Sequence, residues 1–219
     1  MLIKYFNKTI KFVVLYGFIA LFNPANASPV EAFFVAVVRD DPVNLRRAVD
    51  QGADLNGLSQ HQETALTMAL RLGSQRVIRA LMSDRRLDVN RANGAGETPL
   101  MLAALKGQQE WVRRLLLRGA YVNHPGWTPL HYAASHSSEA ALPMVLMLLE
   151  QHAYIDAASP NGTTPLMMAA QYGIEAVVDT LLDAGADASL RNEQGLSALD
   201  FARRAERPDM VVRLERANP

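Results

Sequence analysis

The sequence predicts an all-α repeat solenoid, in which short helix-turn-helix units are stacked along the chain. The first observation is a motif that occurs at residues 96–104, 126–134 and 162–170, with Gly at the start, Thr-Pro-Leu in the middle and Ala-Ala at the end. The second is its period. When weaker copies are included, the motif places a Thr or Ser at Thr64, Thr98, Thr128, Thr164 and Ser197. The distances between successive members of this series are 34, 30, 36 and 33 residues. A period of this length is the signature of stacked repeats.

Each copy of the motif carries the signals of a helix start. The Thr or Ser hydroxyl accepts a hydrogen bond from an N–H of the first turn, and the Pro that follows takes a position where its missing N–H costs nothing. The motif therefore predicts first helices at 65–72 and 99–106, and the next apolar stretches predict second helices at 75–82 and 109–118. Glycines are expected to end helices with a positive φ, at Gly73, Gly107, Gly119, Gly173 and Gly185.

The region after residue 27 opens with another helix start. Ser28 and Glu31 have the spacing of a capping box, and a second helix is expected over residues 43–50. Asp40 and Asp41 lie in the turn before that helix, where we expect them to cap it rather than to transfer protons.

Taken together, these motifs resemble those of the ankyrin-repeat family, and the chain is similar to exported bacterial proteins of that family. Thr-Pro-Leu, Ala-Ala and the Gly-Ala-x-x-Asn ending at 52–56 and 119–123 carry the resemblance. It covers residues 28–219 as six units: an N-terminal cap repeat at 28–61, repeats at 62–95, 96–125, 126–161 and 162–194, and a C-terminal cap repeat at 195–219.

The resemblance implies that the inner helices and short β-hairpin loops form a concave face, with the outer helices on the convex side. It also implies a non-enzymatic scaffold that binds a protein partner. His follows Thr-Pro-Leu once, at His131, so the Thr–His bond of the family is expected only between Thr128 and His131.

Residues 1–27 have the pattern of a cleaved signal peptide. Three lysines precede an apolar run of 11 residues, and a small-x-small sequence predicts cleavage after Ala27. The alternative is an uncleaved membrane anchor, but the run is shorter than the roughly 20 residues needed to span a bilayer. We expect a bacterial periplasmic protein that meets the membrane only during export. An alternative is full secretion, to the extracellular space or as an effector that binds a target in another cell.

Composition excludes several functions. Without the three leading lysines, 19 basic residues face 22 acidic ones, a net charge of −3, whereas a general nucleic-acid binder carries a basic excess. The chain has no cysteine. No nucleophile, base and orienting group are assembled by a motif, so we expect no enzyme, metal or cofactor. The alternative, a metal-binding or enzymatic role of the histidines, concerns His61, His124, His131, His136 and His152. No heptad seam or long strand edge is present, which favours a monomer.

Aromatic residues supply the candidate binding site for a protein partner. Trp127 follows a loop about three residues shorter than its counterparts, while repeat four carries three extra residues within 135–143. Tyr121 and Tyr154 replace the acidic residue of Gly-Ala-Asp in neighbouring repeats. We expect these three to be anchors, with the two tyrosines forming one ledge near Trp127, and with Tyr172 and His136 nearby at the ends of first helices. Phe33, Trp111 and Tyr132 are expected in the core. Two assignments stay open for Leu142, Met144 and Met147, which belong either to the core or to an apolar surface patch.

Arginines form the second candidate surface. They occupy equivalent places on the second helices of repeats one to three and would form a stripe down the outer face: Arg46, Arg47, Arg79, Arg113 and Arg114. Two interpretations remain open: a solvated face, or a docking patch for an acidic partner or an anionic surface, because Arg binds carboxylate and phosphate bidentately.

Overall fold

The structure is a computed structural model that describes residues 28–217. The expected signal peptide, residues 1–27, lies outside the described residues. The chain consists of two compact units, with the boundary between Glu97 and Thr98. In the described part of the chain, no helix has the length and apolar character that crossing a bilayer requires.

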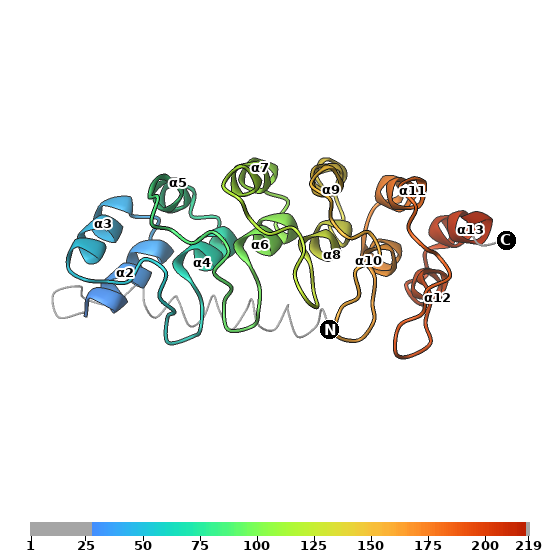
Figure 1. Ribbon diagram of the computed structural model, residues 1–219, viewed down its shortest axis with the longest axis horizontal. Coiled ribbons are helices and arrows are strands. Elements are labelled where there is room, and N and C mark those ends of the chain that lie inside the picture. Colours follow the sequence, from blue (N-terminus) through green and yellow to red (C-terminus); the bar gives the residue numbers. More distant parts are fainter. Residues whose placement is uncertain (1–27, 218–219) are drawn as a thin grey trace. The chain divides into compact units, whose positions relative to one another are not determined.

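The first unit consists of two helix pairs. Helices α2 (Pro29–Val38) and α3 (Pro42–Asp50) pack against each other, as do α4 (Ala65–Leu72) and α5 (Gln75–Ser83). The pairs are stacked, because α2 contacts α4 and α3 contacts α5 (Figure 1). This is the arrangement that the repeat period predicts.

The second unit repeats the same scheme four times. Figure 1 shows an inner row of helices, in which each packs on the next: α6 (Pro99–Leu105), α8 (Pro129–Ala134), α10 (Pro165–Tyr172) and α12 (Ala198–Arg204). The outer helices, also in contact from one repeat to the next, are α7 (Gln109–Leu117), α9 (Ala141–Glu150), α11 (Glu175–Asp183) and α13 (Pro208–Ala217). The all-α repeat solenoid predicted from the sequence is thus confirmed.

The helix starts follow the predicted capping. A capping box is present at Ser28, and others begin α4, α6, α8, α10 and α12. Asp41 caps α3 by accepting the N–H groups of Val43 and Asn44. Asp40 differs from the prediction, because its carboxylate accepts the N–H of Val77 in α5. It therefore ties one repeat to the next instead of capping its own helix.

Most of the predicted glycine stops have the expected backbone. Gly73, Gly107, Gly119 and Gly185 have φ values of 74, 66, 80 and 96°. The prediction is wrong for Gly173, which has an extended backbone with φ −76° and ψ −175°. Its need for glycine is steric, because a Cβ there would overlap the carbonyl oxygen of Ala134.

Buried apolar side chains fill the space between the helix rows of each unit. Phe33 and Trp111 are buried as predicted, and Met144 is a core residue as well. Tyr132 is only half-buried. Its ring lies beside that of Trp127, with centroids 6.5 Å apart, so the two aromatic residues share the surface of α8.

The loops between repeats are reduced hairpins. In the described residues there is no β-strand, only an isolated bridge between Leu58 and Thr64. Each complete loop instead closes a tight turn with two backbone hydrogen bonds, one between residues four apart and one between residues three apart. The bonds between residues four apart join Ser59 to Glu63, Asn93 to Glu97, Ser159 to Thr163 and Asn192 to Leu196, at 2.8–3.0 Å.

Candidate functional site

The turn at the tip of each complete loop is held by the side chain of its first residue. Asn93 Oδ1 accepts the N–H groups of Ala95 and Glu97 at 3.0 and 2.9 Å. Asn192 makes the same pair of bonds in the last loop, and a serine hydroxyl replaces the amide in two others. The Asn or Ser side chain thus accepts hydrogen bonds from backbone N–H groups of the turn. In a longer hairpin, these N–H groups would bond to the opposite strand.

Neighbouring tips are also bonded to each other. In the first unit the N–H of Gly94 donates to the carbonyl oxygen of Gln62 at 2.7 Å. In the second unit the N–H of Glu193 donates to the carbonyl oxygen of Asn161 at 3.0 Å. The second residue of a turn is therefore the donor towards the preceding repeat.

The loop that joins α7 to α8 lacks this turn. Asn123 lies five residues before the capping Thr128, whereas the equivalent Asn56 lies eight residues before Thr64. The predicted shortening is thus confirmed by the helix bounds. In the following repeat, Pro160 occupies the donor position of its turn and has no N–H. Gly126 lies against it, since a Cβ there would be 3.4 Å from the Pro160 ring.

Asn123 bonds to the next repeat. Its Nδ2 donates to the carbonyl oxygen of His152 at 2.9 Å, and its Oδ1 accepts the N–H of Tyr154 at 2.8 Å. Asn56 makes the same two bonds to Arg86 and Asp88 in the first unit. The loop that carries Tyr121 is thereby fixed to the loop that carries Tyr154.

The two tyrosines are the most accessible aromatic candidates. Tyr121 is 66% exposed and Tyr154 is 68% exposed. Both follow the end of an outer helix, and the Asn123 side chain joins their loops. Exposed aromatic rings on a fixed backbone are well suited to be anchors, because little conformational freedom is lost when they are covered.

Trp127 is half-buried at the start of α8. Its ring meets the ring of His131 edge-on, with centroids 5.2 Å apart, and also approaches Tyr132. These contacts attach Trp127 to the inner row of helices. That Tyr121 and Tyr154 form one ledge near Trp127 stays a prediction.

His131 has a structural role. Its Nδ1 accepts the N–H and the hydroxyl of Thr128 at 3.1 and 2.8 Å, and its Nε2 donates to the carbonyl oxygen of Thr163 at 2.9 Å. The expected Thr128–His131 bond is confirmed. Burial lowers the pKa of the imidazole to about 4, against the opposing effect of the bond to Thr163. The ring is therefore neutral at pH 7. In the part of the chain that the structure describes, no group of three or more His, Asp or Glu residues is arranged to hold a metal.

His136 and Tyr172 are half-buried beside the ends of inner helices. His136 Nδ1 accepts the N–H of Ser138 at 3.2 Å, and burial lowers its pKa. Its ring lies over the turn after α6, because a Cβ on Gly107 would be 2.5 Å from Nε2. Burial raises the pKa of the Tyr172 hydroxyl. Part of each side chain stays accessible, and their participation in binding stays a prediction.

The predicted arginine stripe falls on both units. Arg46 and Arg47 on α3 and Arg79 on α5 are exposed in the first unit. Arg113 and Arg114 are exposed on α7 in the second. Arg114 bonds to Glu110 at 2.6 Å and its guanidinium lies 5.3 Å from the centre of the Trp111 ring.

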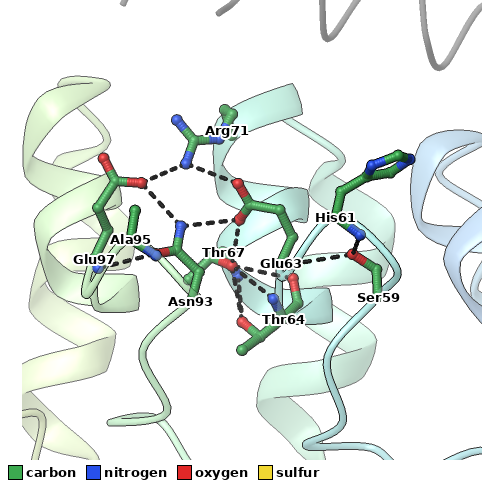
Figure 2. A network of polar contacts seen from close by, with 9 residues as sticks. All are labelled: Ser59, His61, Glu63, Thr64, Thr67, Arg71, Asn93, Ala95 and Glu97. Carbon is green, nitrogen blue, oxygen red and sulfur yellow. Dashed lines mark hydrogen bonds and ion pairs between the residues drawn. The ribbon is translucent and has the colours of Figure 1, made fainter.

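Sequence reasoning missed a polar cluster in the first unit (Figure 2). Arg71 donates to Glu63 and Glu97 at 3.1 and 2.6 Å, and Asn93 donates to the same two carboxylates at 3.1 and 2.8 Å. The two glutamate side chains are 7 and 5% exposed, and that of Arg71 is 14% exposed. Because buried carboxylates need such partners, the cluster joins two successive loops. The repeated Glu before the capping Thr was the available signal.

The repeats also match known proteins. The family profile described as "Ankyrin repeats (3 copies)" matches residues 26–126, 85–158 and 138–216. The chain belongs to the ankyrin-repeat family. Ankyrin repeats are typically non-enzymatic interaction modules that bind protein partners.

Two relatives show how far the ankyrin likeness extends. Over 97 residues the chain is 43% identical to the human (Homo sapiens) neurogenic locus notch homolog protein 4, a match that covers 43% of this chain and 5% of the relative. Over 176 residues it is 32% identical to the B-cell lymphoma 3 protein homolog of Mus musculus, covering 77% of this chain and 39% of the relative. The chain thus spans less than half the length of these relatives.

A solved structure is similar over most of the ankyrin domain. It is a complex of the Bd0816 predatory endopeptidase from Bdellovibrio bacteriovorus with the immunity protein Bd3460. The match has a TM-score of 0.69 and 28% identity, and it covers 84% of this chain and 97% of the matched chain. The two chains therefore share the repeat fold over nearly the whole length of the neighbour.

Proposed function

We propose that this ankyrin-repeat protein is a non-enzymatic scaffold of the bacterial cell envelope, which binds a protein partner through its inner helices and loops. Tyr121 and Tyr154 would be the principal anchors, with Trp127 beside them at the short loop. The observation that carries the proposal is the pair of exposed tyrosines whose loops are joined by Asn123. Tyr and Trp side chains contribute a large share of the energy at many interfaces.

The short loop supports this placement of the binding surface. Its turn is missing, and Pro160 removes the backbone donor that a neighbouring tip would use. A partner segment at this position would therefore be recognised by side chains, above all by Trp127, and not by added strand pairing.

The likeness to the immunity-protein complex favours a second, more specific function. In that complex an immunity protein is bound to an endopeptidase. By analogy, this chain would bind a potentially harmful enzyme of its own cell and keep it inactive. The analogy rests on a shared fold and a similar length.

Export is part of the proposal. The N-terminal pattern of three lysines, an apolar run and small residues before position 28 supports passage to the periplasm. Cell fractionation tests it: the protein is expected in the periplasmic fraction, with Ser28 as its first residue. Recovery from the culture medium would favour the secreted effector instead.

Affinity capture tests the scaffold. The chain from Ser28 would be incubated with periplasmic extract, beside a variant with Trp127, Tyr121 and Tyr154 changed to Ala. The matched control changes three exposed apolar residues of outer helices, Leu117, Leu146 and Val212, to Ala. A partner retained by the wild type and the control and lost by the aromatic variant is expected.

Thermal unfolding of each protein separates a binding defect from a folding defect. Equal capture by a folded aromatic variant would place the site elsewhere on the molecule. An activity assay on the captured partner tests the immunity-type function: if the partner is an enzyme, its activity is expected to fall when the scaffold is added. Bound metal in the protein purified without a histidine tag would instead favour a histidine-based function.

A further inference from the structure

The outer face of the first unit is formed by two helices that are tied together at both ends. Near the start of α3, the Asp40 carboxylate accepts the N–H of Val77 in α5 at 2.7 Å. After their ends, Asn56 bonds to the backbone of Arg86 and Asp88. The two helices therefore run side by side in the same direction, and their middle turns are neighbours.

Acidic side chains compensate the arginines at the two ends of this face. At one end, Arg76 lies close enough to Asp41 to help lower the pKa of its carboxyl group, after the larger effect of the backbone bond from Asn44. At the other end, Arg86 bonds to Asp84 at 2.7 Å and is also influenced by Asp50. Both ends of the face are thus close to neutral.

The middle of the face is different. Arg46, Arg47 and Arg79, here called the central arginine patch, are exposed. Arg47 donates to the neutral Asn44, and within residues 28–97 no acidic side chain forms an ion pair with any of the three. In the second unit, Arg114, Arg203 and Arg213 are each paired with acids, and the exposed Arg113 lies beside the paired Arg114 on α7.

The chemistry of the patch selects its ligand. Three guanidinium groups on two adjacent helices suit several carboxylates at once, because each guanidinium binds a carboxylate bidentately. A membrane surface fits less well. Stable attachment needs an inserted apolar surface or a lipid chain in addition to basic residues, and α3 and α5 expose one large apolar side chain, Val43. The acidic excess after residue 27 argues against nucleic acid.

We propose that the central arginine patch is a second docking surface, which binds an acidic segment of a protein partner. A helix with Glu at positions i, i+3, i+4 and i+7 presents several carboxylates on one face and is a simple segment of this kind. Its complementary charge steers association and fixes orientation on the outer helices. The patch belongs to the first unit, whereas the candidate aromatic anchors belong to the second.

A pair of labelled peptides tests this docking surface. One is an alanine-based helix with Glu at the four positions, and the other has Gln at the same positions. Binding to the purified protein, expressed from the full sequence, is measured by fluorescence anisotropy at about 50 mM and about 300 mM salt. We expect the Glu peptide to bind, the Gln peptide to bind at least about tenfold more weakly, and the higher salt to weaken the Glu complex.

Two variants with the same change in net charge locate the site. Arg46→Gln/Arg47→Gln/Arg79→Gln is expected to weaken binding of the Glu peptide at least about tenfold. The control variant changes three arginines of the last two helices, Arg203→Gln/Arg204→Gln/Arg216→Gln. Its affinity for the Glu peptide is expected to stay within about twofold of that of the wild type. All six side chains are exposed, and a thermal melt verifies that both variants are folded.

Several results would overturn the proposal. These are no binding of the Glu peptide, equal losses in the two variants, or equal binding of the Glu and Gln peptides. Phosphatidylglycerol vesicles and duplex DNA are the competing ligands. Tighter binding of either one than of the Glu peptide, lost in the patch variant, would assign the patch to that ligand and refute the acidic protein segment.

Discussion

Asn123 and Tyr154 are joined across two repeats by a 2.8 Å hydrogen bond, in which the backbone N–H of Tyr154 donates to the Asn123 side chain. The same amide donates to the carbonyl oxygen of His152 at 2.9 Å. Because an amide both donates and accepts, one side chain satisfies two backbone groups of the following repeat. The bond thereby fixes the loop that presents an exposed candidate anchor.

Changing Asn123 to Ala is expected to lower the free energy of unfolding by about 1–3 kcal/mol, because it leaves one backbone donor and one acceptor without this partner. Denaturant unfolding at pH 7 measures the loss. Asn123→Asp is the control, since it keeps the acceptor for Tyr154 and removes only the donor to His152. An Ala variant as stable as the wild type would show that the bond contributes nothing.

In the repeat after Asn123, the equivalent position holds Asp156 instead of Asn. Its carboxylate accepts the N–H of Asp187 at 3.1 Å, and burial raises its pKa, although the bond from Asp187 opposes the rise. A raised pKa means that the folded state binds the proton more tightly than the unfolded state, so stability increases as the pH falls from 7 towards about 4. We expect Asp156→Asn to raise Tm at pH 7 and to reduce this increase.

Thermal melts at pH 7 and at about pH 4.5 measure the effect of Asp156. Asp187→Asn is the matched control, because bonds to Ser189 lower the pKa of Asp187. Asp187 therefore contributes stability at neutral pH that is lost on acidification, the opposite sign. If Asp156→Asn lowered Tm at pH 7, the assignment of Asp156 as a destabilising charge would be wrong.

His131 gives a second pH effect, of larger size. Burial lowers its pKa to about 4 in the folded state, while the unfolded value is about 6.5. The unfolded state therefore takes up the proton first as the pH falls, and stability is lost between pH 6.5 and 4. The loss is on the order of 3 kcal/mol.

A methionine variant isolates the contribution of His131. Met101 and Met167 occupy the same position in neighbouring repeats and accept the N–H of the capping Thr through sulfur. His131→Met is expected to fold and to lose less stability than the wild type between pH 6.5 and 4. The comparison is made by denaturant unfolding at both pH values. If the free energy of unfolding fell by the same amount in both proteins between pH 6.5 and 4, the assignment of this pH effect to His131 would be contradicted.

Substitutions at two glycines distinguish the effect of steric crowding from the effect of backbone strain. A Cβ at Gly173 would overlap the carbonyl of Ala134 and come within 3.0 Å of the carbonyl oxygen of Ala169. At Gly185, φ is +96° and a Cβ would meet nothing within 4 Å. We therefore expect Gly173→Ala to lower stability by more than about 3 kcal/mol and Gly185→Ala by about 1 kcal/mol. Equal losses, measured by denaturant unfolding, would contradict the steric role of Gly173.

The local parts of the fold were predictable from the sequence. Capping residues such as Thr64 and Ser197 act within their own helix turn, so their spacing alone located the helix starts. Counting residues between Asn123 and Thr128 was enough to detect the short loop. These features depend on neighbours within a few residues, where sequence distance and spatial distance agree.

Contacts between repeats were the part that could not be predicted. Asp40 reaches Val77, and Glu63 shares donors with Glu97, over separations of more than 30 residues. Such contacts depend on how far one repeat is displaced from the next. The same limit applies to the arginine surface, because only the structure distinguishes Arg76, which lies near Asp41, from the central arginine patch.

The most direct test of the protein-binding proposal is the affinity of the captured partner for Tyr121→Ala/Tyr154→Ala, measured by titration calorimetry beside Leu146→Ala/Val212→Ala, which changes two residues of outer helices. The control removes two exposed apolar residues outside the proposed site. We predict that the tyrosine variant binds at least about tenfold more weakly than the wild type, while the control retains its affinity. An unchanged affinity of the folded tyrosine variant would contradict the assignment of these residues as anchors.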